Sequence, residues 1–373
     1  MPELSNDTNV HAQFARNKKS HSFLSSVIWG FLAFAVLLAA LAGLARTDFI
    51  TAFFPLRSVG SYHSQFELKW FDLQNYVTEH GGVDVVILGN STVNTGIDPV
   101  IFQSRYRELS GKDLRVFNFG VEGLTIEPLS EIAKLIDATY HPGTIILFTE
   151  MRDYIASNGV EVSQQFLGNS WMRYQMADFS VQGFLIDHVT LLEYLLPFRN
   201  WSNPTFTDTY RLTLYRQGNL SPEGYEPEKY IGFGGHIPDP TNPEEIIKYK
   251  QAANYSIDPG RIRDLLDVIS LQQNGTRVLI TEIPLYPTYF VYFGSSAVRE
   301  QYLAAIDSTV SNAGSTFIPS IDEELIPIYG RADDHHLNFQ GVPIYSKLLA
   351  DRFFAACELQ STCLISASEV NQP

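Results

Sequence analysis

The chain has 373 residues, of which 45% are hydrophobic and 18% charged, an ordinary balance for a globular protein with one large or two modest domains. Its formal net charge of −15 argues against a general nucleic-acid binder, because contacts to phosphates need a clustered basic face. Polyol, glycan and acyl substrates remain open.

A long apolar run lies near the amino terminus. Residues 23–45, "FLSSVIWGFLAFAVLLAALAGLA", carry no charge, and a helix of this length measures about 34 Å, enough to cross a bilayer core of about 30 Å. Arg16, Lys18 and Lys19 precede the run. This pattern predicts a cytoplasmic segment 1–22, one membrane span over 23–45, and an exported remainder in the periplasm or outside the cell. The alternative is a cleavable signal peptide that ends in "LAALAGLA".

An alternation of strands and helices follows a connector over 46–81. Short apolar runs that predict buried strands alternate with amphipathic patterns that predict helices. The predicted strands cover residues 83–89, 114–120, 143–150, 276–284 and 315–321, and a closing helix covers 341–356. This order predicts one α/β domain over 82–356, built on a doubly wound parallel sheet of about five strands.

A large insertion interrupts that alternation at about residues 154–249. It is rich in aromatic residues, turns, Pro and Gly, which is typical of a functional insertion or a lid rather than of plain disorder. We expect it to cover the carboxyl edge of the sheet and to shape a binding cleft. Cys357 and Cys363 stand at the start of a C-terminal tail, 357–373, and in an oxidising compartment they could form a disulfide, which the spacing alone does not establish.

The stretch 86–99, "VILGNSTVNTGIDP", reads as an apolar strand that stops at Gly-Asn-Ser. Ser91 in this position is either a turn and capping residue or a nucleophile, since open α/β sheets place their ligands at the carboxyl ends of strands. Acyl transfer at a serine also needs a base, an acid that orients the base, and donors for the oxyanion. "RADDHHLNFQG", residues 331–341, supplies a histidine and acids in the last strand-to-helix loop.

Three sequence blocks together carry a family resemblance. "LGNS" (88–91), "NFGVEG" (118–123) and "DDHHLN" (333–338) resemble, in the right order, the first, second and last blocks of the SGNH (GDSL-type) hydrolase superfamily. The resemblance implies a flavodoxin-like parallel sheet and ester chemistry. It implies Ser91 as nucleophile, His336 as base and Asp333 as the acid that orients the imidazole.

The same resemblance implies the oxyanion donors. The backbone N–H groups of Ser91 and Gly123 would serve, and the third block of the family usually supplies an Asn. Here the corresponding loop is "TEMRDY", which places Arg152 where that Asn belongs. Arg152 would donate to the oxyanion, contact an acyl group or glycan, or pair with Glu150.

Two further residues are expected to contact substrate. Asn90 stands where the family often has Asp, and it keeps a side chain that forms hydrogen bonds. His335 does not fit the Asp-x-x-His spacing and is expected beside the site or on the substrate. Asn338 is expected to cap the closing helix or to brace its loop.

Other chemistries are alternatives for the same residues. The cluster of Asp333, Asp334, His335 and His336 has ligand types that suit a divalent metal, but adjacent side chains rarely converge on an ion without ligands from elsewhere. We therefore expect no metal and no cofactor. A carboxylate pair for glycoside hydrolysis in "TEMRDY" is a weaker alternative than an ion-paired loop.

The sequence predicts a membrane-anchored, extracytoplasmic serine acyl esterase or O-acyltransferase that acts through an acyl-enzyme on Ser91. Its expected substrate is an ester of a cell-envelope polysaccharide or a related ester, and its expected partners are the membrane and a membrane acyltransferase. The alternative is a non-catalytic envelope assembly or glycan-binding protein that retains the fold.

Overall fold

The computed structural model describes residues 23–37, 39–40, 43, 50, 53–228, 242, 255–287, 289, 296–318 and 325–359. Its centre is a parallel sheet in the order β2-β1-β3-β4-β5. The strands are β1 (Val85–Gly89), β2 (Val116–Gly120), β3 (Thr144–Phe148), β4 (Arg277–Thr281) and β5 (Thr316–Ile318). The predicted five-stranded parallel α/β fold is confirmed, and the strand order is that of flavodoxin-like sheets.

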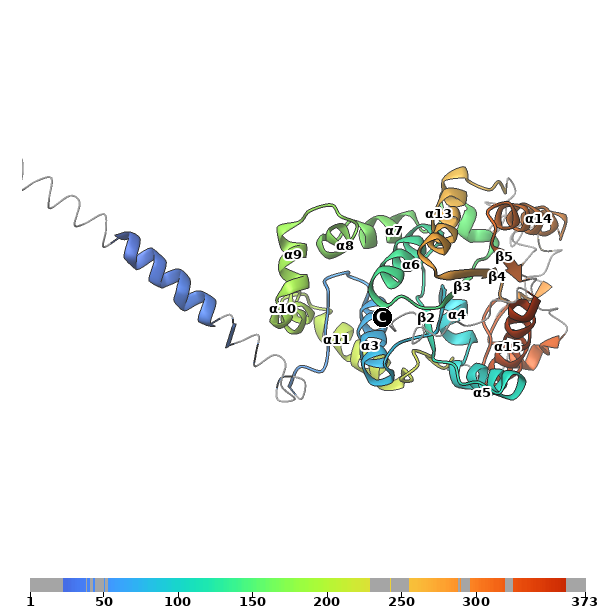
Figure 1. Ribbon diagram of the computed structural model, residues 1–373, viewed down its shortest axis with the longest axis horizontal. Helices are drawn as coiled ribbons and strands as arrows, with labels where there is room; N and C mark the ends of the chain where they lie inside the picture. The colour runs from blue at the N-terminus through green and yellow to red at the C-terminus, as the bar shows by residue number, and fades with distance from the viewer. Residues whose placement is uncertain are drawn as a thin grey trace, which may run out of the picture.

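Helices cover both faces of the sheet (Figure 1). α5 (Pro99–Ser110) packs against α15 (Gly341–Leu359) on one face, and α6 (Ile126–Tyr140) packs against α13 (Pro259–Ile269) on the other. All five residues of each of β1, β2 and β3 are buried, because strands covered on both faces are apolar throughout rather than alternating.

Three more helices complete the framework. α3 (Ser64–His80) precedes β1, α4 (Ser91–Gly96) directly follows it, and α14 (Ser296–Asn312) packs beside β5. The helix ends follow local chemistry. Asp98 caps α5 by accepting hydrogen bonds from two backbone N–H groups, and Gly111 ends α5 in the left-handed conformation.

The described part of the insertion is more regular than its composition predicts. Residues 151–219 contain short helices, which are η1 (Met151–Tyr154), α7 (Val160–Leu167), α8 (Ser170–Gln175), α9 (Val181–His188), α10 (Thr190–Leu195), η2 (Leu196–Phe198) and α11 (Phe206–Asn219). Most are under nine residues long, and no residue of α11 is buried. Helices this short give weak periodic patterns, which are hard to distinguish from turns in a sequence.

The structure does not support the predicted membrane-spanning helix. Among the described residues, no helix is long and apolar enough to cross a bilayer. Residues 23–37 are helical and exposed, whereas residues 38, 41, 42, 44 and 45 of the predicted span lie outside the described part of the chain.

The C-terminal tail is described only as far as residue 359, at the end of α15. Cys357 is buried in the core. Cys357 is disulfide-bonded, and its predicted partner Cys363 lies outside the described residues.

Candidate active site

Ser91 is the first residue of α4, at the carboxyl edge of the sheet. β1 pairs with β2 on one side and with β3 on the other, so the chain reverses its direction of crossover at β1. Ligands of open α/β sheets bind at such a switch point. The strand-to-helix turn therefore places Ser91 where a reacting group would meet a ligand.

Two glycines, Gly89 and Gly120, allow α4 to pack closely against the sheet. A Cβ on Gly89 would lie 2.4 Å from Val93 Cγ2, and a Cβ on Gly120 would lie 2.2 Å from the backbone nitrogen of Asn94. Real Cβ atoms do not approach so closely. The absence of side chains at these two strand ends lets α4 rest directly on β1 and β2.

Asn90 braces the turn that carries Ser91. Its Oδ1 accepts hydrogen bonds from the Thr92 backbone N–H at 2.9 Å and from the Thr92 hydroxyl at 2.8 Å. Its Nδ2 donates to Glu150 Oε1 at 2.6 Å, and the residue is buried. Contact of Asn90 with substrate, which the sequence predicts, stays a prediction.

The structure brings Ser91, His336 and Asp333 together. His336 Nε2 lies 2.9 Å from Ser91 Oγ, and His336 Nδ1 lies 2.8 Å from Asp333 Oδ2. With the proton on Nδ1, the imidazole donates to the carboxylate and accepts from the hydroxyl. This is the arrangement in which a histidine can remove the serine proton.

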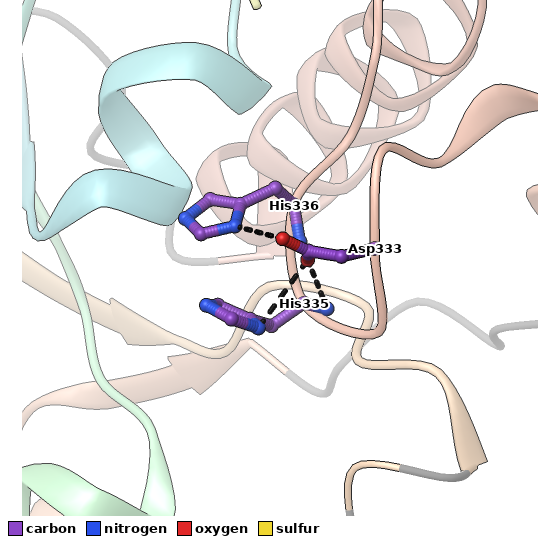
Figure 2. Close-up of side chains that lie close together, drawn as sticks. All are labelled: Asp333, His335 and His336. Carbon is purple, nitrogen blue, oxygen red and sulfur yellow. Dashed lines mark hydrogen bonds and ion pairs between the residues drawn. The ribbon is translucent and has the colours of Figure 1, made fainter. Parts of the chain in front are cut away.

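The loop itself holds Asp333 in place. Asp333 Oδ1 accepts the backbone N–H groups of His335 at 2.9 Å and of His336 at 2.7 Å. Figure 2 shows the carboxylate reaching both imidazole rings, which lie 3.9 Å apart between centroids. Spacing of three residues thus lets one carboxylate bind the backbone and the side chain of the same histidine.

The Asp333 carboxyl is held in its charged form. Burial alone would raise its pKa, but the hydrogen bond from His336 and the positive charge that His335 and His336 can carry outweigh burial and hold the pKa well below its usual range. Asp333 therefore stays an anion beside the imidazole, as the orienting acid of such a site must.

His335 lies beside the site and is not part of the hydrogen-bond chain that joins Asp333, His336 and Ser91. Its Nδ1 lies 2.8 Å from Asp334 Oδ1 and 3.3 Å from Asp333 Oδ1. Burial lowers the pKa of His335, but the hydrogen bond to Asp334 and the charges of Asp333 and Glu150 outweigh it, so that the net pKa is raised. His335 thus places a more readily protonated ring on the wall of the site.

A cavity of about 420 Å³ opens at Ser91. Its lining includes His335, His336, Gly123 and Arg152. Gly123 has a φ of +74°, and a Cβ there would meet no atom within 4 Å, so the backbone faces open space. The predicted oxyanion donors Ser91, Gly123 and Arg152 therefore share one cavity; their action on an oxyanion stays a prediction.

A buried carboxylate ties the turn of Ser91 to Arg152. Glu150 accepts from Asn90 Nδ2, from Arg152 Nε, and from the Tyr289 hydroxyl at 2.8 Å. Although burial raises the pKa of Glu150, Arg152 and His335 outweigh burial and lower it, so the carboxylate is charged. The pairing of Arg152 with Glu150, one of its three predicted roles, is present.

Asp153 lies in the same loop as Glu150, but its pKa is shifted in the opposite direction. Its Oδ2 accepts the backbone N–H of Glu150 at 2.9 Å. Burial and the nearby charge of Glu150 raise the pKa of Asp153 well above its ordinary value. Asp153 is only 1% exposed and does not line the cavity at Ser91, so its role is to hold the loop together.

The histidine cluster has some features of a metal site. Asp333, His335 and His336 each offer one ligand atom, and these three atoms lie within 4.8 Å of one another. In this arrangement Asp333 Oδ2 and His336 Nδ1 already bind each other, so an ion would have to displace the hydrogen bond that orients the base.

Asn338 both caps and braces, as the sequence predicts. Its Oδ1 accepts the backbone N–H groups of Gln340 at 2.9 Å and Gly341 at 3.3 Å at the start of α15. Its Nδ2 donates to the carbonyls of Tyr329 at 2.8 Å and Arg331 at 3.0 Å. The loop that carries the base is fixed at both ends.

A buried lysine lies behind α4, and the sequence gives no sign of its role. Lys69 Nζ donates to the backbone oxygen of Asn118 at 3.2 Å and to Asn118 Oδ1 at 3.3 Å. Asn118 Nδ2 in turn donates to the α4 carbonyl of Val93 at 2.8 Å and to that of Ile97 at 2.7 Å. Burial lowers the pKa of Lys69 to about 7, partly opposed by Glu226.

The free energy of unfolding should therefore increase with pH, because the pKa of Lys69 is lowered in the folded protein. Its folded pKa of about 7 lies below the ordinary 10.5, so between these values the unfolded chain binds a proton that the folded chain does not. We expect the free energy of unfolding, measured in urea at about pH 7.5 and 9.5, to increase more in the wild type than in Lys69→Met. Equal increases in the two proteins would contradict this assignment.

Comparisons with known proteins add little about activity. No protein-family model and no curated protein matches the chain. Among solved structures, it is 12% identical to a Streptococcus pneumonia chain described as a platelet activating factor, with a TM-score of 0.37, covering 77% of this chain and 92% of that one. It is also 12% identical to a gut microbial diltiazem-metabolizing enzyme, with a TM-score of 0.35, covering 74% of this chain and 46% of that one. Likenesses this weak do not bear on function.

Proposed function

We propose that this chain is a serine-dependent acyl esterase or O-acyltransferase of the SGNH type. The observation that carries the proposal is the unbroken hydrogen-bond relay from Asp333 Oδ2 through His336 to Ser91 Oγ, with steps of 2.8 and 2.9 Å. The location of Ser91 at the switch point of the sheet, on the wall of a cavity of about 420 Å³, supports it.

The chemistry follows from the roles of the three side chains. His336 Nε2 takes the hydroxyl proton as Ser91 Oγ attacks the acyl carbon, and Asp333 stabilises the imidazolium that forms. The backbone N–H groups of Ser91 and Gly123 and the guanidinium of Arg152 face the negative oxygen of the tetrahedral intermediate.

Collapse of that intermediate leaves an acyl ester on Ser91. The leaving alcohol receives the proton from His336, which is then neutral again. In the second half, His336 removes a proton from water or from an acceptor hydroxyl, which attacks the acyl carbon. The bond between that carbon and Ser91 Oγ then breaks, and His336 returns the proton to Ser91 Oγ, which restores the free serine. Hydrolysis and transfer differ only in the identity of that acceptor.

We further propose that the enzyme works in the cell envelope on an ester of a polysaccharide, beside a membrane acyltransferase. This location rests on the apolar sequence 23–45 and on the basic residues before it. The exposed fractions of Phe23, Trp29 and Phe31 in the helix 23–37 are 73%, 69% and 73%. An apolar surface of this kind favours contact with lipid or protein over water.

The test is covalent labelling of the full chain with a fluorophosphonate, which reacts with activated serines. We expect labelling of the wild type and none of Ser91→Ala or His336→Ala, with p-nitrophenyl acetate turnover lost in parallel. Ser104→Ala, which changes an exposed hydroxyl on α5 bonded only to the helix backbone, is the matched control and should label normally. Labelling that persists in both site variants would reject the assignment.

A second candidate is a glycan-binding or envelope assembly protein without turnover. The ion pair of Arg152 with the buried Glu150 favours it, because a neutralised guanidinium stabilises an oxyanion less well. In that case Ser91 would not label with fluorophosphonate, while the wild type would still bind glycans.

A further inference from the structure

A second cavity, of about 380 Å³, lies beside the one at Ser91. It is bounded by the first turn of α6, the segment that leads into α7, and the first turns of α13, three elements that lie together in Figure 1. Residues from each of them line it, among them Glu127, Gln164 and Arg263.

The two cavities share the same two stretches of chain. Residues 122–125 line the cavity at Ser91, and Glu127 lines the second one. Arg152 and Asn158 line the first, whereas Ala156 and Val160 line the second. The two cavities therefore lie against the same two segments of backbone.

Arg261 connects the walls of the two cavities. It lines the second cavity and is only 5% exposed. Its guanidinium donates to Thr125 Oγ1 at 3.3 Å and to the Asn158 carbonyl at 3.2 Å, both residues of the first cavity. It also pairs with Glu127 at 2.9 Å. One buried side chain thus binds residues that line both cavities.

The lining of the second cavity is mostly polar. Two arginines, three acids and a glutamine outnumber the apolar side chains of Ala156 and Val160. Glu127, Asp258 and Arg261 already bond within the protein. A long acyl chain would still cover the polar side chains of Gln164, Arg263 and Asp264 without offering them partners, which is costly. Mixed donors and acceptors of both charges instead suit a ligand with many hydroxyl groups and little net charge, such as a sugar unit.

We propose that the second cavity is a subsite for a neighbouring sugar unit of the substrate, so that the enzyme acts on a glycan chain of at least two units rather than on a small ester. The acyl group reacts at Ser91, and the chain continues past Thr125 and Asn158 toward Gln164 and Arg263. This inference rests on the proposed function, since it names the substrate class of the same site.

The test uses O-acetylated cello-oligosaccharides of one, two, four and six sugar units with the full chain. In the wild type, kcat/KM should rise from one unit to two or more. The double variant Gln164→Ala with Arg263→Ala should lower the ratio of kcat/KM for six units to that for one unit by about 5- to 10-fold, mainly through KM. Arg173→Ala, an exposed arginine of α8 paired with Asp178, is the control and should keep the wild-type ratio.

The outcomes separate the two proposals. A value of kcat/KM that does not depend on chain length, an unchanged ratio in the double variant, or turnover of p-nitrophenyl acetate without turnover of any oligosaccharide would overturn the subsite while Ser91 still labels with fluorophosphonate. Loss of that labelling would instead overturn the proposed function.

Discussion

Replacing Asp333 by Asn should lower kcat by about 10⁴-fold while the loop stays folded. The amide oxygen can still accept the backbone N–H groups of His335 and His336, which Asp333 Oδ1 accepts at 2.9 and 2.7 Å. The amide NH₂, however, would face His336 Nδ1 and favour the tautomer with its proton on Nε2. That nitrogen faces Ser91 Oγ and could no longer accept the hydroxyl proton. Turnover of p-nitrophenyl acetate measures the loss.

The neighbouring acid provides the matched control for this prediction. Asp334→Asn removes the same charge one residue away, but Asp334 faces His335 at 2.8 Å and does not touch the base. We expect less than about a 10-fold loss of kcat, as for a residue outside the relay. If Asp334→Asn were the more damaging change, the orienting acid would have been misassigned.

Gly120→Ala should damage stability and activity together. The added Cβ would lie 2.2 Å from the Asn94 nitrogen and 2.8 Å from the Val93 carbonyl carbon, both backbone atoms of α4. Since backbone cannot swing aside as a side chain can, α4 must shift and carry Ser91 with it. We expect a loss of about 1–3 kcal/mol in the free energy of unfolding and about a 100-fold loss of kcat.

Urea unfolding and p-nitrophenyl acetate turnover test this prediction on the same samples. Gly218→Ala is the control, because a Cβ there would meet no atom within 4 Å and the residue lies in α11. It should leave activity unchanged and raise stability by up to about 1 kcal/mol. Wild-type activity in Gly120→Ala would show that α4 does not need its close contact with β2.

The sheet could be predicted from the sequence because its strands are apolar throughout. The predicted strand 83–89 contains the observed Val85–Gly89, and the predicted 276–284 contains Arg277–Thr281. The predicted strands extend too far because apolar residues continue into the loops at the sheet edge. Periodicity marks burial, and burial does not end where the hydrogen-bonded ladder ends.

The site was only partly predictable. Ser91, Asp333 and His336 stand out because their residue types and order match one chemistry. Tyr289 does not, since it is one of 19 tyrosines and its sequence neighbours carry no pattern. Lys69 is equally hidden, because a lysine between apolar residues of a helix normally extends to solvent. Only the tertiary fold shows which polar groups it meets.

The hydrogen bond between Ser91 and His336 joins residues 245 positions apart. Between them the chain must complete β2, β3, the insertion, β4 and β5, and His336 lies just before the last helix of the described chain. Contacts this distant in sequence form late, because a long loop must be closed before they can stabilise anything. During synthesis, a chain that has released Ser91 but not yet His336 carries the proposed nucleophile without its proposed base. The proposed activity would thus begin only after nearly the whole domain has been synthesised and folded.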